Sequence, residues 1–250
     1  MPIETRGRTA LAPEIDLPPP FTLVTLREVG DAFAHAVNLA PKQGAGTLVY
    51  VGRFDLAEFA VVLEPDEPLR TARRAFYTGM VALIDALLSH APPEKPIAID
   101  WPDTILIDRG LVGGGQLAWP KGAREDEPPP WLVFGAMIRT VSMTDNPGLH
   151  PMAAALDEEG FTDVAAAELV ASFARHLMVH VDALHEGGFG AIAREYLKRL
   201  PREAGMRRDI DENGDLLVRR TAKENAEHMD LKLALATPSW LDPKTRGPRL

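Results

Sequence analysis

Cysteine is absent from the 250-residue chain. Its absence excludes disulfide bonds, thiolate ligands for metals and cysteine nucleophiles. No window of the sequence reaches the roughly 18 apolar residues that a membrane-spanning helix needs. The first ten residues also lack the apolar core of a signal peptide. These absences favour a cytoplasmic protein that works without thiol chemistry.

The balance of charge is acidic. Lysine and arginine total 27 against 36 aspartates and glutamates, so the formal net charge is -9 at pH 7. This balance argues against an extended contact with nucleic acid or an anionic membrane, although it permits a local basic pocket. We therefore expect neither nucleic acid nor membrane as a partner. The length and the 46% apolar content are typical of one large globular domain, or a main domain with a small appendage.

The first two thirds of the chain mix strand and helix patterns in an irregular order. Residues 1–20 hold five prolines and are expected to form an extended arm. The order of the remaining patterns indicates an α+β fold, with helices packed on a mixed sheet. The expected strands are 21–26, 46–51, 59–63 and 131–141, and the expected helices are 31–39 and 72–90.

The last third is mainly helical. Apolar residues at helical spacing predict helices over 163–186 and 189–200, separated by Gly187-Gly188. The Asn213-Gly214 pair predicts a β-hairpin over 207–220. A closing helix is expected over 221–235, followed by a loose tail of fifteen residues that contains three prolines.

Residues 97–119 carry the most informative pattern. They predict two adjacent strands joined by a tight turn at Asp108-Arg109-Gly110. Pro102 cannot donate to a sheet ladder, so it marks a bend or an edge. The alternating apolar positions are Ile99, Trp101, Ile105 and Ile107.

This Trp-Pro segment resembles the strand pair at the active site of the biotin protein ligase and lipoate-protein ligase family. The family motif reads Lys-Trp-Pro-Asn-Asp-Ile and, after a turn, Lys-Val-Gly-Gly-Ile-Leu. Further stretches resemble the family in the same order, namely 46–50, 131–138, the helix through Phe173 to Tyr196, and 211–218. The resemblance covers about residues 25–220. It implies a class II synthetase-like catalytic domain over 21–160 and a small helical and β part over 161–250.

The resemblance also implies a chemistry. Ligases of this family activate a carboxylic acid with ATP and pass the acyl group to a lysine of a carrier protein. The expected partners are therefore biotin, lipoate or octanoate, together with a carrier protein, and the expected cofactors are ATP and magnesium. The residues expected to bind the ligand are Gly52, Arg53, Asp100, Trp101, Asp103, Gly113, Gly114 and Gly115.

The departures from the family pattern fall on the catalytic charges. The position of the strand lysine, which stabilises negative charge as the acyl-adenylate forms, is Asp100 here. The glycine- and arginine-rich loop is reduced to Gly52-Arg53. No residue is assigned as catalytic, unless a loop lysine folds in; the candidates are Lys42, Lys95 and Lys121. Two hypotheses remain: a divergent ligase, and a catalytically inactive homologue that senses a small acid or contacts a protein.

Each candidate also has a structural interpretation. Asp100 could be a surface carboxylate or a magnesium ligand, and Arg53 a solvated turn residue. Trp101 could simply be a core residue. The histidines at 176, 180 and 185 have helical spacing but no H-E-x-x-H pattern, and the acidic run 209–215 lacks the last glutamate of a calcium loop, so no metal site is expected. An edge strand would permit a homodimer.

Overall fold

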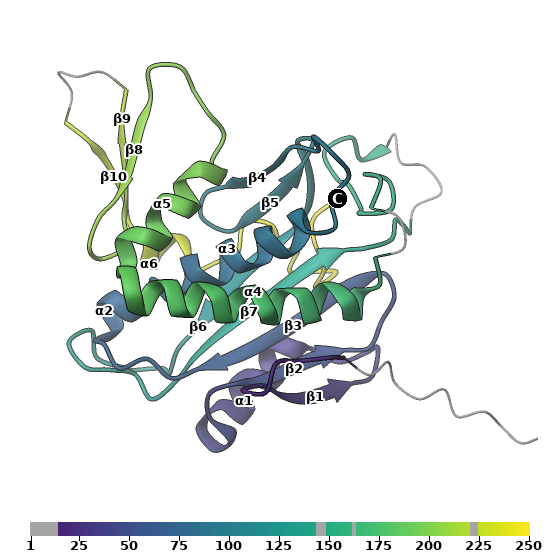
Figure 1. The fold of residues 1–250 in the computed structure, drawn as a ribbon, viewed down its shortest axis with the longest axis horizontal. Coiled ribbons are helices and arrows are strands. Elements are labelled where there is room, and N and C mark those ends of the chain that lie inside the picture. Colours follow the sequence, from purple (N-terminus) through teal and green to yellow (C-terminus); the bar gives the residue numbers. More distant parts are fainter. Residues whose placement is uncertain (1–14, 144–148, 162–163, 221–224) are drawn as a thin grey trace, which may run out of the picture.

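The computed structural model describes residues 15–143, 149–161, 164–220 and 225–250. Its centre is a seven-stranded sheet in the order β1-β2-β3-β7-β6-β5-β4 (Figure 1). Only β1 and β2 pair in parallel, so the sheet is mixed and the α+β prediction is confirmed. The strands are β1 (Thr22–Leu26), β2 (Thr47–Val51), β3 (Leu56–Leu63), β4 (Ile97–Asp100), β5 (Thr104–Ile107), β6 (Gly110–Ala118) and β7 (Leu132–Arg139).

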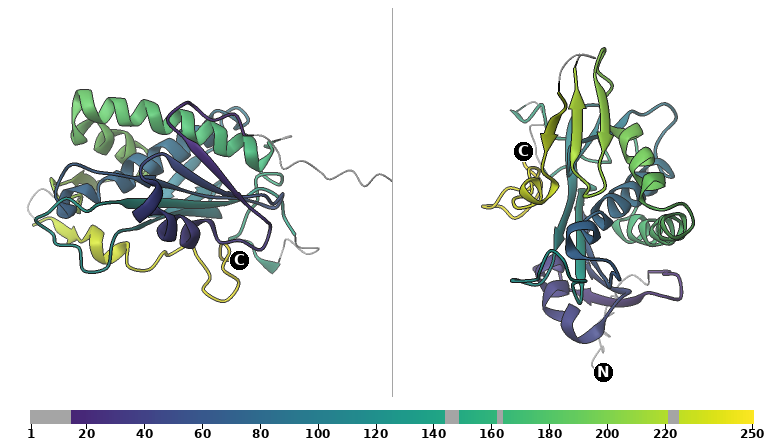
Figure 2. Two further views of the ribbon diagram at one scale, coloured as in Figure 1. Left: turned by 90° about the horizontal axis from the view of Figure 1, so that it is seen from below. Right: turned by 90° about the vertical axis from the view of Figure 1, so that its left-hand side faces the viewer.

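Helices cover both faces of this sheet. On one face lie α3 (Ala75–Leu88) and α4 (Ala166–Gly187), joined by α5 (Phe189–Arg199). The opposite face carries α1 (Ala32–Gln43) and the end of the chain, as Figure 2 shows. Strands β2, β3 and β7 therefore have apolar residues on both sides, which explains why they are continuous apolar runs rather than alternating ones.

The expected strand pair over 97–119 is in fact three strands. A cis peptide bond joins Trp101 to Pro102 in the turn between β4 and β5, and these two short strands pair antiparallel. Pro102 cannot donate to the ladder, so the chain turns back at this point instead of continuing as one strand. The turn before β6 places Asp108 and Arg109 at positive φ, as expected for a tight connection.

The C-terminal third departs from the sequence prediction in two places. The hairpin β8 (Arg207–Ile210) with β9 (Leu216–Arg219) is confirmed. The closing helix is wrong, because the described part of 221–235 forms β10 (Glu227–Met229), which adds a third strand, and only one helical turn, α6 (Leu231–Ala234). Residues 221–224 lie outside the described residues. A further short helix, α2 (Leu69–Ala72), precedes α3.

The loose tail is also wrong. Trp240 lies within residues 236–250, which we call the C-terminal segment, and its side chain is fully buried. The expected arm over 1–20 lies largely outside the described residues, but Ile15 is buried against the main core. In the described ranges, no helix is long and apolar enough to cross a membrane.

The three helices on one face are joined by a single carboxylate. Asp85 of α3 accepts hydrogen bonds from His180 of α4, at 2.8 Å, and from Arg199 of α5, at 2.9 Å. Burial acts to raise the pKa of Asp85, but the hydrogen bond from His180 and the charge of Arg199 outweigh it, so its pKa lies below the usual range. This arrangement also explains His180 without a metal ion.

Replacing this carboxylate should destabilise the protein in a pH-dependent way. The folded pKa of Asp85 is lowered, so its contribution is present above the unfolded value of about 3.9 and is lost as pH falls through the folded value. We expect Asp85→Asn to lower the free energy of unfolding by about 1–3 kcal/mol at pH 7. Urea titrations at several pH values should show this difference shrinking below about pH 4.

The control for this experiment is Asp182→Asn, on an exposed position of α4. It should change the free energy of unfolding by less than about 0.5 kcal/mol. An Asp85→Asn effect that stayed constant down to pH 3 would show that ionised Asp85 does not stabilise the fold through His180 and Arg199.

Candidate functional site

The C-terminal segment lies across the sheet face opposite α3 and α4. Trp240 donates its indole N–H to the carbonyl oxygen of Gly115 at 2.8 Å and packs against Leu56 and Met137. The preceding residue, Ser239, is held by the carboxylate of Asp103, which accepts from its backbone N–H at 2.8 Å and from its hydroxyl. The segment is therefore hydrogen-bonded to the β4–β5 turn, which carries the Trp-Pro motif, and to β6, which carries the glycines.

The three consecutive glycines of β6, Gly113 to Gly115, allow close packing on both sides of the strand, and Gly114 faces the C-terminal segment. A Cβ atom on Gly114 would lie 2.1 Å from the carbonyl oxygen of Asp103 and 2.3 Å from Trp240 Cδ1. Gly115 faces the other side of the sheet, where a Cβ atom would lie 2.5 Å from the sulfur of Met80. Gly113 has a φ of +153° and its backbone is too close to Met137 for a side chain. The indole of Trp240 thus occupies the space beside Gly114 that the sequence had suggested for a ligand.

The end of the segment is held by two arginines. Arg139, at the end of β7, donates to the carbonyl oxygens of Pro248 at 2.8 Å and Ala154 at 3.0 Å. Arg246 forms an ion pair with Asp31, the N-cap residue of α1. Burial lowers the pKa of the Arg139 guanidinium, whose ordinary value is so high that it stays charged.

Thr245 and Arg246 line two cavities on this face. The Arg139 cavity has a volume of about 310 Å³ and is also lined by Arg53 and His150. The Glu58 cavity has a volume of about 380 Å³ and lies between the C-terminal segment and the loop before α1. Arg53 lines both cavities, so it marks the boundary between them.

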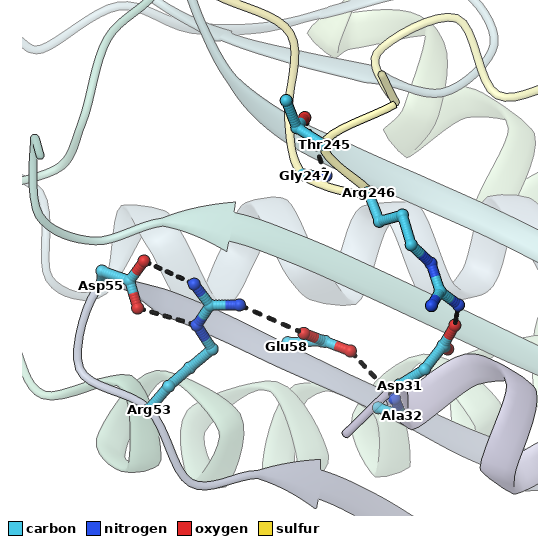
Figure 3. Close-up of polar contacts among 8 residues, drawn as sticks. All are labelled: Asp31, Ala32, Arg53, Asp55, Glu58, Thr245, Arg246 and Gly247. Atoms are coloured by element: carbon cyan, nitrogen blue, oxygen red, sulfur yellow. Dashed lines mark hydrogen bonds and ion pairs between the residues drawn. The ribbon is translucent and has the colours of Figure 1, made fainter. Parts of the chain in front are cut away.

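Arg53 is already paired. Its guanidinium donates twice to the carboxylate of Asp55, at 2.7 and 2.6 Å (Figure 3). The hydrogen bond to Asp55 is the main reason that the pKa of Arg53 is raised. Within the β2–β3 turn the cation therefore has a bidentate anionic partner, and any ligand anion would compete with it.

Glu58 is a buried carboxylate that lines the Glu58 cavity. It lies on β3, and one of its oxygens accepts from the backbone N–H of Ala32, the first residue of α1, at 2.9 Å. The other oxygen lies 4.0 Å from Arg53 Nη1, beyond hydrogen-bond distance. Burial raises the pKa of Glu58.

The structure disperses the site residues that the sequence predicts. Arg53 lines the cavities, and Gly52 beside it donates its N–H to Leu26 in β1. Asp100 is exposed at the end of β4. Trp101 points to the helix side, where its indole donates to the hydroxyl of Tyr77 at 3.2 Å. Neither Asp100 nor Trp101 lines the two cavities.

Asp103, by contrast, is buried where it binds the C-terminal segment, and burial raises its pKa. Sequence reasoning missed Glu58, Arg139, Trp240 and Arg246. Glu58 and Arg139 could have been suspected, because a single charged residue inside or at the end of an apolar strand needs a partner.

The three candidate loop lysines do not reach the site. Lys42 is exposed in the last turn of α1, and Lys121 is exposed in the loop after β6. Lys95 donates to Glu159 at 2.8 Å. Within the described part of the chain, no lysine lines either cavity. Arginines are therefore the permanently charged cations among the described residues that line these cavities.

Two of the three histidines on α4, His176 and His180, have structural roles. His180 bonds Asp85, and His176 lies 2.9 Å from the carbonyl oxygen of Ser172. The described residues do hold one group with metal-ligand geometry, formed by Asp211, Asp215 and His228 around the β8–β9 turn. Backbone N–H groups already use one oxygen of each of these aspartates.

Comparison with known proteins places the chain in a family. The sequence profile of the biotin/lipoate A/B protein ligase family matches residues 17–198, so the chain belongs to this family. A solved structure of a biotin protein ligase-like protein of unknown function from a Silicibacter species is 28% identical, with a TM-score of 0.77. The match covers 90% of this chain and 100% of that one.

More distant structures share the fold. Biotin protein ligase from Aquifex aeolicus is 15% identical, with a TM-score of 0.66 over 84% of this chain and 95% of that chain. The same enzyme in complex with biotin and ATP has a TM-score of 0.63 at 15% identity, over 83% and 94% of the two chains. A search of curated protein sequences finds no match.

Truncating the central side chain of the C-terminal segment should destabilise the whole fold. Trp240→Ala removes a fully buried indole and leaves Gly115 without its donor. We expect it to lower the free energy of unfolding by about 3–5 kcal/mol, measured by urea titration.

Leu233→Ala is the control, because Leu233 is 72% exposed in α6. It should change the free energy of unfolding by less than about 0.5 kcal/mol. A Trp240→Ala effect below about 1 kcal/mol would mean that the segment is not part of the folded core.

Proposed function

We propose that this protein binds a small carboxylic acid on the sheet face beneath the C-terminal segment and does not convert it to an adenylate. The observation that carries this proposal is the composition of the two cavities, which contain arginines but no lysine among their described lining residues. The chain would then be a sensor or interaction protein built on the ligase fold.

Arg139 is the residue best placed to hold the acid. Its side chain is half-buried and lines the Arg139 cavity. It donates its hydrogen bonds to carbonyl oxygens rather than to a carboxylate. A ligand carboxylate would form a charge-assisted, bidentate pair with it. Two of its present acceptors, the carbonyls of Pro248 and Arg249, belong to the C-terminal segment, so acid binding would exchange with contacts of that segment.

The surrounding charges argue against adenylate formation. A ligase must stabilise the negative charge that develops between the acid and the phosphate. Here Arg53 is already paired with Asp55, and Glu58 lies within 4.0 Å of the same guanidinium. Trp240 also covers Gly114, so less of the sheet face is left on which an acid and a nucleotide could bind side by side.

A divergent ligase is the second candidate. It is favoured by Arg53 and Arg139 lining one cavity, because two guanidinium groups suit a phosphate. The Aquifex aeolicus enzyme of the same fold is described in complex with biotin and ATP. In that case ATP and magnesium would be used and a carrier protein would receive the acyl group. The carrier protein, a homodimer, the cytoplasmic location and the division at residue 160 stay predictions.

Calorimetric titration distinguishes the two candidates. Biotin, lipoate and octanoate are each titrated into the protein with and without ATP and magnesium. The binding protein should take up at least one acid with an affinity that ATP changes less than about 2-fold, and Arg139→Gln should weaken it about 10-fold or more, equivalent to about 1.4 kcal/mol. Arg124→Gln, in an exposed loop, should have no effect.

The outcome that favours the ligase is different in kind. ATP would tighten acid binding at least 10-fold, and pyrophosphate would be released in proportion to the acid. Failure of all three acids to bind would overturn acid binding itself.

A further inference from the structure

The Glu58 cavity is lined by more carboxylates than its cations can match. Glu28, Asp31 and Glu58 face it, together with Arg53 and Arg246. Both arginines have anionic partners, since Arg53 is bound by Asp55 and Arg246 by Asp31. Glu28 has no cation partner among the described residues, and Glu58 has only a 4.0 Å ion pair with Arg53, so carboxylates outnumber cations on this side of the site.

Glu58 is more than a cap for α1. Asp31 already caps that helix by accepting from the N–H of Ala34 at 2.8 Å. One oxygen of Glu58 accepts from the N–H of Ala32, and the other forms a 4.0 Å ion pair with Arg53 but no hydrogen bond. Figure 3 shows this carboxylate between Arg53 and the start of α1. Glu58 lines the cavity, and its second oxygen accepts no hydrogen bond from the described residues, so it can accept one from a ligand.

We propose that the Glu58 cavity binds a cationic nitrogen, an ammonium or a guanidinium group, through the open carboxylate oxygen of Glu58. Where the proposed acid binding also holds, the ligand is an acid that carries such a nitrogen at its far end, with the carboxylate at Arg139. Binding of the ligand carboxylate at Arg139 rests on the proposed function, whereas recognition of the nitrogen by Glu58 does not.

The rest of the cavity suits the chain between the two charged ends. Phe33 and Met137 give it apolar side chains beside the carboxylates. An alkyl chain can pack on these side chains while its charged end reaches Glu58. An ordinary fatty acid would leave that oxygen without a donor, and a carboxylate placed there would be repelled by it.

The test uses four eight-carbon compounds that differ only in their end groups, and the full-length protein. Octanoate, 8-aminooctanoate and octylamine are titrated by calorimetry, with octanol as the neutral reference. We expect 8-aminooctanoate to bind at least 10-fold more tightly than octanoate, and octylamine at least 10-fold more tightly than octanol. Glu58→Gln keeps the acceptor for Ala32 but removes the charge, so it should abolish both preferences and leave octanoate binding unchanged or tighter.

Glu64→Gln is the matched control, because Glu64 is exposed just beyond the end of the same strand and lines neither cavity. It should preserve both preferences. Octylamine binding that depends on Glu58 supports the inference even if no carboxylic acid binds, which separates it from the proposed function. Equal affinity for amine and alcohol, or an amine preference that survives in Glu58→Gln, would overturn it.

Discussion

The arrangement of the site depends on the contact between the indole of Trp240 and the bare backbone of Gly114 and Gly115. The missing Cβ of Gly114 makes room for the ring, and the carbonyl of Gly115 accepts its N–H. The buried carboxylate of Asp103 fixes Ser239 immediately before it. Because this point is held, the chain continues across the sheet face and brings Thr245 and Arg246 between two cavities, with Pro248 against Arg139.

This contact fills space beside the glycine-rich strand with a side chain of the protein itself. A glycine-rich strand can keep a surface free for a ligand, but here the freed surface is covered by the protein's own side chain. The arginines on this face also have partners within the protein. Asp55 binds Arg53, Asp31 binds Arg246, and carbonyl oxygens of the C-terminal segment bind Arg139. The chain belongs to the biotin/lipoate ligase family and shares the fold of biotin protein ligases.

Most of the sheet and the main helices could be predicted from the sequence, because their apolar patterns are local. The hairpin at Asn213-Gly214 could be predicted for the same reason. The site could not, because its contacts join residues far apart in the chain: Asp103 to Ser239 is a separation of 136 residues, and Gly115 to Trp240 one of 125. The composition of the last fifteen residues, with three prolines, resembles a loose tail, and only the glycines of β6 explain why it is packed. Asp100 and Trp101 matched a motif, but Pro102 turns the chain there and leaves them away from both cavities.

The C-terminal segment is an integral part of the folded protein. Hydrogen–deuterium exchange of the full-length chain tests this most directly, with mass spectrometry of peptides that cover residues 236–250. We expect slow exchange at the amides of Ser239, Asp242 and Arg249, which are hydrogen-bonded to Asp103, Gly247 and Trp240. Their protection should approach that of β7. Exchange of these amides at the rate of an unfolded peptide, while β7 remains protected, would contradict it.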